Sequence, residues 1–306
     1  MHEATIRYRS IVADSARWEG FPFRDGDIVI STPLKCGTTW TQMICALLIF
    51  QTPNFDRPLT KISPWLDMLT ADRGEVVAAL AAQSHRRFIK THTPLDGLPL
   101  DDRVIYICVG RDPRDAGFSW SNHQVNLNMD TFFTARREAV GDADLDELLP
   151  DGPQAPPPTE IERFWRWVDS TTPASESPTS LVALLHHVRT FWPATIGAAN
   201  LVLLHYDDLQ ADLEGQMRQL AQRLGIKVPE HRWPELVPAA RFGEMRRRAD
   251  DLVPNQGDAL WHDNASFFHR GTSGQWRTRL DEEDLRRYHR RVAELGDPEV
   301  AGWLHR

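Results

Sequence analysis

The chain is predicted to fold as an α/β protein with a doubly wound parallel sheet covered by helices on both faces. Four short, almost wholly apolar runs alternate with helical patterns, at 27–32, 87–90, 103–109 and 200–206. Strands that are buried on both faces of a parallel sheet have such continuous apolar runs, whereas half-exposed strands alternate apolar and polar residues. With 306 residues the chain is long enough for one large domain spanning 1–306, and two small domains are the alternative.

Each run is paired with a helical segment. A loop and a helix at about 38–50 follow the first run, and a helix begins at about Pro113, a residue well tolerated in a first turn. Behind the last run one helix carries apolar residues at helical spacing, namely Leu209, Leu213, Met217, Leu220 and Leu224. Ligands of such sheets bind beyond the carboxyl ends of the strands. Functional residues are therefore expected just after Thr32, Lys90, Val109 and Tyr206.

Composition excludes several classes of partner. A net charge of −8 argues against nucleic-acid binding through the phosphate backbone and against broad attraction to an anionic membrane. The three cysteines are odd in number and lack metal-ligand spacing, which favours a reducing compartment. The charged N-terminal region does not read as a signal peptide, and the apolar run 43–50 is too short to span a bilayer. We expect a cytoplasmic protein without a membrane span.

The stretch 125–180 differs from the rest of the chain. It contains an acidic segment, three consecutive prolines at 156–158, a Ser/Thr/Pro cluster and an aromatic island at 164–167. A long segment of this kind inside a compact domain is usually functional or mobile. We predict an excursion or lid over the active site whose aromatic and apolar residues form a hydrophobic acceptor pocket, with a linker as the alternative.

The loop 31–40, between the first strand and its helix, is a candidate anion site. Amides at a helix N-terminus point outward, the helix dipole is positive there, and Gly37 lets the backbone approach a ligand closely. Lys35, one of only four lysines, adds charge. An ordinary turn capped by Thr38 is the alternative. A Walker loop is excluded, because the lysine precedes the glycine and no earlier glycine is present.

The order Lys-x-Gly-Thr-Thr-Trp in this loop resembles the 5′-phosphosulfate loop of the cytosolic sulfotransferase family. The resemblance implies a P-loop-like sheet and a donor, 3′-phosphoadenosine 5′-phosphosulfate (PAPS), whose 5′ end binds Lys35, Cys36, Gly37, Thr38, Thr39 and Trp40. It also implies that Lys35 neutralises charge growing on the leaving oxygen. The family usually has serine at the position of Cys36. A thiol near a helix N-terminus is expected to be acidic, so its alkylation should block donor binding.

The segment 90–94, Lys-Thr-His-Thr-Pro, is similar to the Lys-Thr-His-Leu-Pro element of that family. The resemblance makes His92 the base that takes the acceptor's proton and makes Lys90 steady the transferring group. Imidazole titrates near neutral pH and suits this work. A single histidine among twelve is otherwise more often a surface or packing residue.

The segment 109–119 is similar to the 3′-phosphate signature of the family, an arginine followed eight residues later by a serine. It implies that Arg111 and Ser119 bind that phosphate and that Ser119 restrains Lys35 until acceptor arrives. The two residues are about 12 Å apart by helical rise, so Arg111 must reach back. Arg114 and Asp115 are interpreted as an ordinary solvated helix start.

The segment 267–276 is similar to the family's Arg-Lys-Gly-x-x-Gly-Asp-Trp element, which closes over the 3′-phosphate. The residues implied are Phe267, His269, Arg270 and Gly271. A histidine at 269 is a weaker phosphate partner than a bidentate guanidinium. Trp40 and Phe242 match residues that sandwich the adenine, and Tyr206 matches a nucleotide-site tyrosine; without the resemblance these three would be core residues.

Together the motifs predict a PAPS-dependent sulfotransferase without a metal, acting on a hydroxyl of a small hydrophobic acceptor: a phenol, sterol, lipid or glycolipid. Two alternatives are a P-loop nucleotide kinase, which would need the missing Gly-Lys-Ser/Thr loop, and a non-catalytic module that binds adenosine 3′,5′-bisphosphate. The sequence leaves the acceptor's identity and the oligomeric state open.

Overall fold

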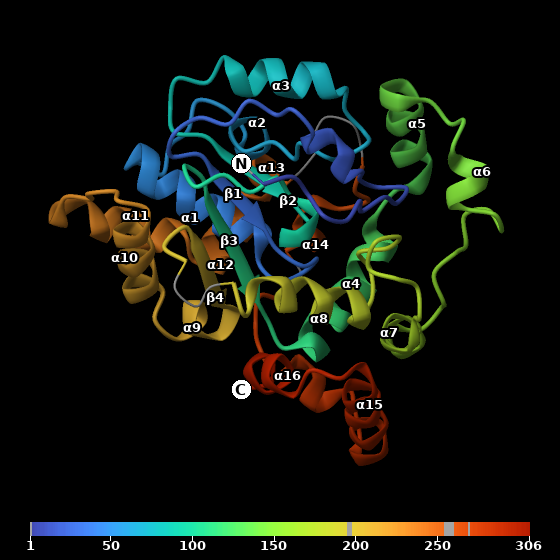
Figure 1. The fold of residues 1–306 in the computed structure, drawn as a ribbon. Coiled ribbons are helices and arrows are strands. Elements are labelled where there is room, and N and C mark those ends of the chain that lie inside the picture. Colours follow the sequence, from blue (N-terminus) through green and yellow to red (C-terminus); the bar gives the residue numbers. More distant parts are fainter. Residues whose placement is uncertain (1, 195–197, 254–259, 269) are drawn as a thin grey trace.

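The centre of the protein is a parallel sheet with the strand order β2-β1-β3-β4 (Figure 1). The computed structural model describes residues 2–194, 198–253, 260–268 and 270–306. Its strands are β1 (Ile28–Ser31), β2 (Phe88–Thr91), β3 (Ile105–Gly110) and β4 (Leu201–His205). All three neighbouring pairs are parallel. The four predicted strands and the predicted parallel sheet are confirmed.

Side chains of each strand alternate between two apolar cores. On β1, Ile28 and Ile30 enter one core and Val29 enters the other; on β3, Ile107 and Cys108 divide in the same way. Both faces are therefore buried, which explains why the strands are continuously apolar in sequence.

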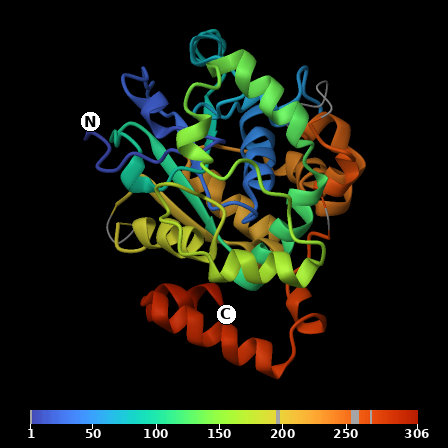
Figure 2. The same ribbon diagram turned by 90° about the vertical axis from the view of Figure 1, so that its right-hand side faces the viewer.

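Helices cover both faces, as predicted for a doubly wound sheet. The first core includes residues of α1 (Thr38–Phe50), α2 (Leu59–Ile62), α9 (Tyr206–Ala211), α10 (Leu213–Arg223), α11 (Trp233–Ala239), α12 (Phe242–Arg247) and α13 (Ala249–Leu252). The second includes residues of α3 (Arg73–Ala81), α4 (Pro113–Asn126), α7 (Glu160–Asp169), α8 (Leu181–Phe191), α15 (Glu282–Leu295) and α16 (Pro298–Leu304). In both views α15 and α16 lie beyond α7 and α8 at the bottom of the molecule (Figures 1 and 2). Among the described residues, no helix is long and apolar enough to cross a bilayer.

Local capping explains where two helices begin, and corrects two expectations. α1 starts at the predicted residue, but its cap is Gly37, with a left-handed φ of 100°, and Thr38 lies inside the helix. The single helix predicted after β4 is two helices, α9 and α10. Asp212 is non-helical between them, and its carboxylate accepts the amide of Gly215 to start α10.

Half of the stretch 125–180 is helical. It contains α5 (Met129–Val140), α6 (Leu145–Leu148) and α7, and Figure 1 shows them on the right of the molecule. Its aromatic island lies on α7, where Phe164 and Trp167 are buried and Phe164 stacks on Phe118 with ring centroids 4.4 Å apart. Phe164 and Trp167 of this island therefore pack in the core between α4 and α7.

Candidate active site

The candidate active site lies at the carboxyl edge of the sheet. β1 has β2 on one side and β3 on the other, so the chain leaves β1 at the point where strand order reverses. One pocket there is lined by Lys35, His92, Arg111 and Tyr206, which follow β1, β2, β3 and β4. The residues that the sequence analysis placed after the four strands therefore lie together at this edge.

Most of the residues proposed from the motifs meet in this pocket. Its lining includes Lys35, Gly37, Thr38, Thr39, Trp40, Lys90, His92, Arg111, Ser119, Tyr206, Phe242, Phe267, Arg270 and Gly271. Cys36 does not line it, and His269 lies outside the described residues.

The loop after β1 is held in shape by residues of the neighbouring strands. Lys35 adopts a left-handed φ of 65°, rare for a residue with a side chain, and its carbonyl accepts a hydrogen bond of 3.0 Å from Nη1 of Arg111. A Cβ on Gly37 would lie 3.2 Å from the Tyr206 ring. The loop therefore needs both its glycine and its arginine brace.

The Lys35 ammonium contacts a residue that the motifs did not indicate. Its Nζ lies 3.0 Å from Nδ1 of His123 and 5.0 Å from the ring centroid of Phe267. Ser119 lines the pocket, but the restraint on Lys35 expected from it is supplied here by His123. His123 follows Ser119 by four residues on α4, so it shares that face of the helix, and this spacing is the signal that could have found it.

Burial, together with nearby charges, shifts the protonation of Lys35. Burial, with the nearby Arg111 and Lys90, lowers the pKa of Lys35 to about 7. Burial likewise lowers the pKa of Lys90 to about 8, and its Nζ lies 4.3 Å from the Trp65 ring centroid. A bound anion would therefore stabilise the charged form of both lysines and raise the pKa of each.

His92 is held in one tautomer at the end of β2. Its Nδ1 lies 2.7 Å from the carbonyl oxygen of Thr32, which can only accept, so Nδ1 carries the proton and Nε2 keeps its lone pair. Burial and the positive charge of Lys90 hold the pKa of His92 well below its usual range. At neutral pH the ring is therefore uncharged and able to take a proton at Nε2.

Arg111 is a buried residue of the pocket lining, with 4% of its surface exposed. Besides Lys35, its Nη2 donates to the carbonyl of Thr272 at 3.1 Å, and its guanidinium lies 4.2 Å from the Tyr206 ring centroid. Its Nε has no hydrogen-bond partner among the described residues. A buried unpaired donor is costly, so this atom fits an anionic ligand group.

The expected solvated helix start after Arg111 is wrong. Asp115 is fully buried and accepts the amides of Gly274 and Gln275 at 2.6 and 2.8 Å, which fixes the C-terminal loop against α4. Arg114 pairs with Asp112 and lies 3.7 Å from the Trp276 ring centroid. Both charges are buried because they join α4 to the loop that completes the site.

Aromatic rings line the pocket beside the α1 loop. Nε1 of Trp40 donates to the carbonyl of Ala240 at 2.7 Å, and its ring packs edge-on against Tyr206 at 5.1 Å. Phe242 lies so close to Gly271 that a Cβ there would come within 2.0 Å of the Phe242 ring. Trp40 and Phe242 thus have fixed positions on the wall of the pocket.

Cys36 points away from the pocket. Its side chain is fully buried in the core between the sheet and α4, and burial raises the pKa of its thiol to about 12. The predicted acidic, donor-blocking thiol is wrong. Apolar surroundings outweigh its nearness to the helix N-terminus.

Apart from the motif residues, the described lining of the pocket is largely apolar, and these apolar residues are called the apolar chamber below. The walls of this chamber are Val12, Trp65, Met68, Trp120, Leu127, Phe132, Leu260, Trp261 and Phe268. Phe268 belongs to the motif segment 267–276, and Leu127 and Phe132 belong to the stretch 125–180. The other residues come from segments outside these, far apart in sequence. Nothing local in the sequence marks them as neighbours.

Comparison with known proteins identifies the family. The family model described as the sulfotransferase domain matches residues 25–297. A glycolipid sulfotransferase of Mycobacterium bovis is 42% identical over 317 residues, which cover 99% of this chain and 96% of the relative. The luciferin sulfotransferase of Photinus pyralis is 24% identical, with 86% of this chain and 70% of the relative covered.

Solved structures share the fold. Retinol dehydratase in complex with androsterone and the inactive cofactor PAP superposes with a TM-score of 0.69 at 21% identity, covering 92% of this chain and 83% of that one. A mouse sulfotransferase complexed with PAP gives a TM-score of 0.67 at 17% identity, covering 94% and 90%. The P-loop-like α/β fold is confirmed. Because the family model spans most of the chain and the mycobacterial relative matches nearly all of it, the chain belongs to the sulfotransferase family and is a PAPS-dependent enzyme.

Proposed function

We propose that the chain transfers a sulfuryl group from PAPS to a hydroxyl of a lipid-like acceptor, with a glycolipid as the leading class. The observation that carries this proposal is the single pocket in which His92 and Lys35 meet an apolar chamber. Such a chamber accommodates a hydrocarbon or ring body and leaves the hydroxyl at the polar end. The name of the mycobacterial relative, glycolipid sulfotransferase, supports the same class.

The donor-binding residues follow from charge and shape. We assign the 5′ end to the 35–40 loop, and the 3′-phosphate to Arg111, Ser119 and Arg270. The unpaired Nε of Arg111 supports this assignment. Trp40 and Phe242 offer aromatic faces to a purine, with Tyr206 beside them. PAPS supplies the sulfuryl group and the bisphosphorylated leaving nucleotide.

The protein's part in the reaction is positioning and charge stabilisation. Nε2 of His92 takes the proton of the acceptor hydroxyl, while the Thr32 carbonyl keeps the ring oriented through Nδ1. Lys35 places a positive charge where the leaving oxygen becomes negative, and Lys90 lines the same pocket, near enough for its charge to affect Lys35. Nδ1 of His123 contacts Nζ of Lys35.

Leu127, Phe132 and Thr179 are the residues of the predicted acceptor segment that line the pocket. We propose that these residues, rather than the whole stretch 125–180, recognise the acceptor.

A pair of measurements tests the proposal. Adenosine 3′,5′-bisphosphate should raise the melting temperature, because a ligand of the folded state stabilises it by mass action, and ATP with magnesium should not. The variant His92→Ala should keep this shift and lose sulfuryl transfer to a glycolipid by about 100-fold or more. Stabilisation by ATP alone would overturn the donor assignment.

Control experiments test the role of His92 and the alternative of a non-catalytic nucleotide-binding module. His186→Ala removes a histidine outside this pocket and should leave turnover unchanged. Turnover that survives in His92→Ala would remove His92 as the base. Binding of the bisphosphate without transfer to any hydroxyl acceptor would favour a nucleotide-binding module.

A further inference from the structure

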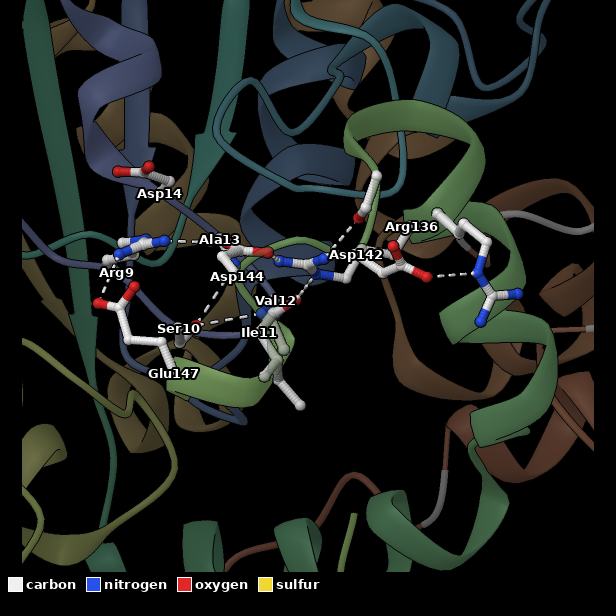
Figure 3. A network of polar contacts seen from close by, with 12 residues as sticks. Arg9, Ser10, Ile11, Val12, Ala13, Asp14, Arg136, Asp142, Asp144 and Glu147 are labelled. Carbon is white, nitrogen blue, oxygen red and sulfur yellow. Dashed lines mark hydrogen bonds and ion pairs between the residues drawn. The ribbon is translucent and has the colours of Figure 1, made fainter. Parts of the chain in front are cut away.

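A buried arginine joins α5 to the N-terminal segment. The side chain of Arg136 is fully buried, and its guanidinium bonds three groups (Figure 3). Nε donates to the Ile11 carbonyl at 3.1 Å, Nη1 to the Gly141 carbonyl at 2.8 Å, and Nη2 to Asp144 at 2.7 Å. Every partner lies outside α5, so the Arg136 side chain connects α5 to the N-terminal segment and to the residues that follow α5.

The carboxylate of Asp144 extends this connection. Its second oxygen accepts from Nη2 of Arg9 at 3.1 Å, and Nη1 of Arg9 pairs with Glu147 on α6 at 3.0 Å (Figure 3). Arg9 and Asp144 are each under a third exposed, so water screens this pair only in part. The N-terminal segment, α5 and α6 therefore share one polar network.

Both segments that the network joins reach the apolar chamber. Val12 follows Ile11, the residue whose carbonyl Arg136 bonds, and Phe132 lies one turn before Arg136 on α5. Phe132 is only 2% exposed. On its other side the N-terminal segment is fixed by the amide of Leu69, which donates to the Val12 carbonyl at 2.8 Å.

The opposite end of α5 is also tied down. The amide of Asn128 donates to the Leu260 carbonyl at 2.9 Å, and Leu127 forms a bridge with Trp261. With both ends of α5 anchored, the chamber wall at Phe132 depends on the Arg136 network for its distance from Val12.

We infer that the network of Arg9, Arg136 and Asp144 positions the chamber wall made by Val12 and Phe132 and thereby determines which acceptors fit. The inference rests on the proposed function, since it assumes that the acceptor occupies this chamber. The three polar residues act through the wall and do not touch the reacting atoms. Loosening the wall weakens the placement of a small rigid acceptor and leaves the nucleotide end of the pocket unchanged.

The test compares Asp144→Asn with a control on α5, at the residue next to Arg136. Arg137→Gln removes a neighbouring ion pair, Arg137–Asp142, in which both side chains are more than half exposed. The probes are a naphthol, as a small rigid acceptor, and dodecyl glucoside, as a long one. For Asp144→Asn we expect the KM for the naphthol to rise roughly tenfold, a change typical of lost positioning, with kcat reduced less. Bisphosphate affinity should stay within about twofold of the wild type, and Arg137→Gln should match the wild type throughout.

A double-variant cycle ties the effect to the wall. Phe132→Ala should raise the KM for the naphthol more than that for dodecyl glucoside, and adding Asp144→Asn should change it little further, because both act on one surface. If Asp144→Asn does not fold, Arg9→Gln serves instead, since it leaves the Arg136–Asp144 pair intact. Equal KM values in Asp144→Asn and Arg137→Gln, or fully additive effects with Phe132→Ala, would overturn the inference. A wild-type protein that sulfates neither probe nor any glycolipid would overturn the proposed function instead.

Discussion

Lys35 is the residue of the site whose charge responds most directly to pH. Its pKa is lowered to about 7 by burial and by the charges of Arg111 and Lys90. Near pH 7, with no nucleotide bound, a part of the molecules therefore carries Lys35 as a neutral amine. An anionic nucleotide favours the charged form. Binding should therefore take up a proton when the pH exceeds this pKa.

We expect the affinity for adenosine 3′,5′-bisphosphate to fall as pH rises through this range. The limiting slope is about tenfold per pH unit for each proton taken up, and Lys90, with a pKa of about 8, adds to it. Calorimetry in two buffers of different ionisation enthalpy would measure both the affinity and the proton uptake. Lys35→Arg keeps its charge and should flatten the dependence. An affinity that is constant from slightly acid to alkaline pH would show that Lys35 stays charged without ligand.

At the scale of elements, the loop around Gly271 illustrates how a turn and a ring fit each other. Gly271 has a left-handed φ of 62°, and a Cβ would strike the Phe242 ring. Gly225 has nearly the same φ of 66° but nothing within 4 Å of a Cβ. A substitution at Gly225 therefore causes backbone strain alone, whereas one at Gly271 adds a steric clash with the Phe242 ring.

Alanine at these two glycines should have different effects. Gly225→Ala should cost about 1–2 kcal/mol of stability through left-handed strain and leave bisphosphate affinity unchanged. Gly271→Ala should add displacement of Phe242 and weaken that affinity by about tenfold or more, since an aromatic contact is lost from the nucleotide. Melting curves and binding isotherms give the two readouts. Equal affinities in the two variants would remove Phe242 from the nucleotide site.

Some elements could be predicted from the sequence and others could not, for physical reasons. Strands such as β3 could be predicted because a strand that is buried on both faces has a continuous apolar sequence. The location of His92 and Arg111 in the candidate site could be predicted because both residues belong to motifs that directly follow predicted strands. The break at Asp212 was missed because the apolar spacing continues across it, and only the capping carboxylate ends the helix. Val12 was missed, and Phe132 was covered only by the broad prediction for 125–180, because their proximity depends on long-range contacts.

Across the whole molecule, stability and catalysis are divided between the two edges of the sheet. At the amino edge Asp27 and Arg87 form a buried pair, with Nε of Arg87 donating to Asp27 at 2.8 Å and both side chains at most 2% exposed. This pair joins the starts of β1 and β2, at the edge opposite the pocket.

Removing this pair should affect folding but not binding. Asp27→Ala leaves a buried guanidinium unpaired, which costs about 3–5 kcal/mol. Asp25→Ala, two residues earlier, removes a carboxylate that is 85% exposed and pairs with Arg103, so it should cost less than about 1 kcal/mol. Urea titrations measure both changes. Where the variants are folded, their affinity for the bisphosphate should match the wild type, and a parallel loss of affinity would show that the two edges are coupled.

The brace from Arg111 to the Lys35 carbonyl has a consequence for how the enzyme tells nucleotides apart. One guanidinium orders the backbone of the 35–40 loop and also presents Nε to the proposed 3′-phosphate site. A nucleotide without that phosphate would leave Nε unpaired and the brace less firmly fixed. The loop that receives the opposite end of the ligand would then be less ordered. Discrimination against adenosine 5′-phosphosulfate should accordingly arise from cooperation between the two ends of the nucleotide, in addition to the one missing contact.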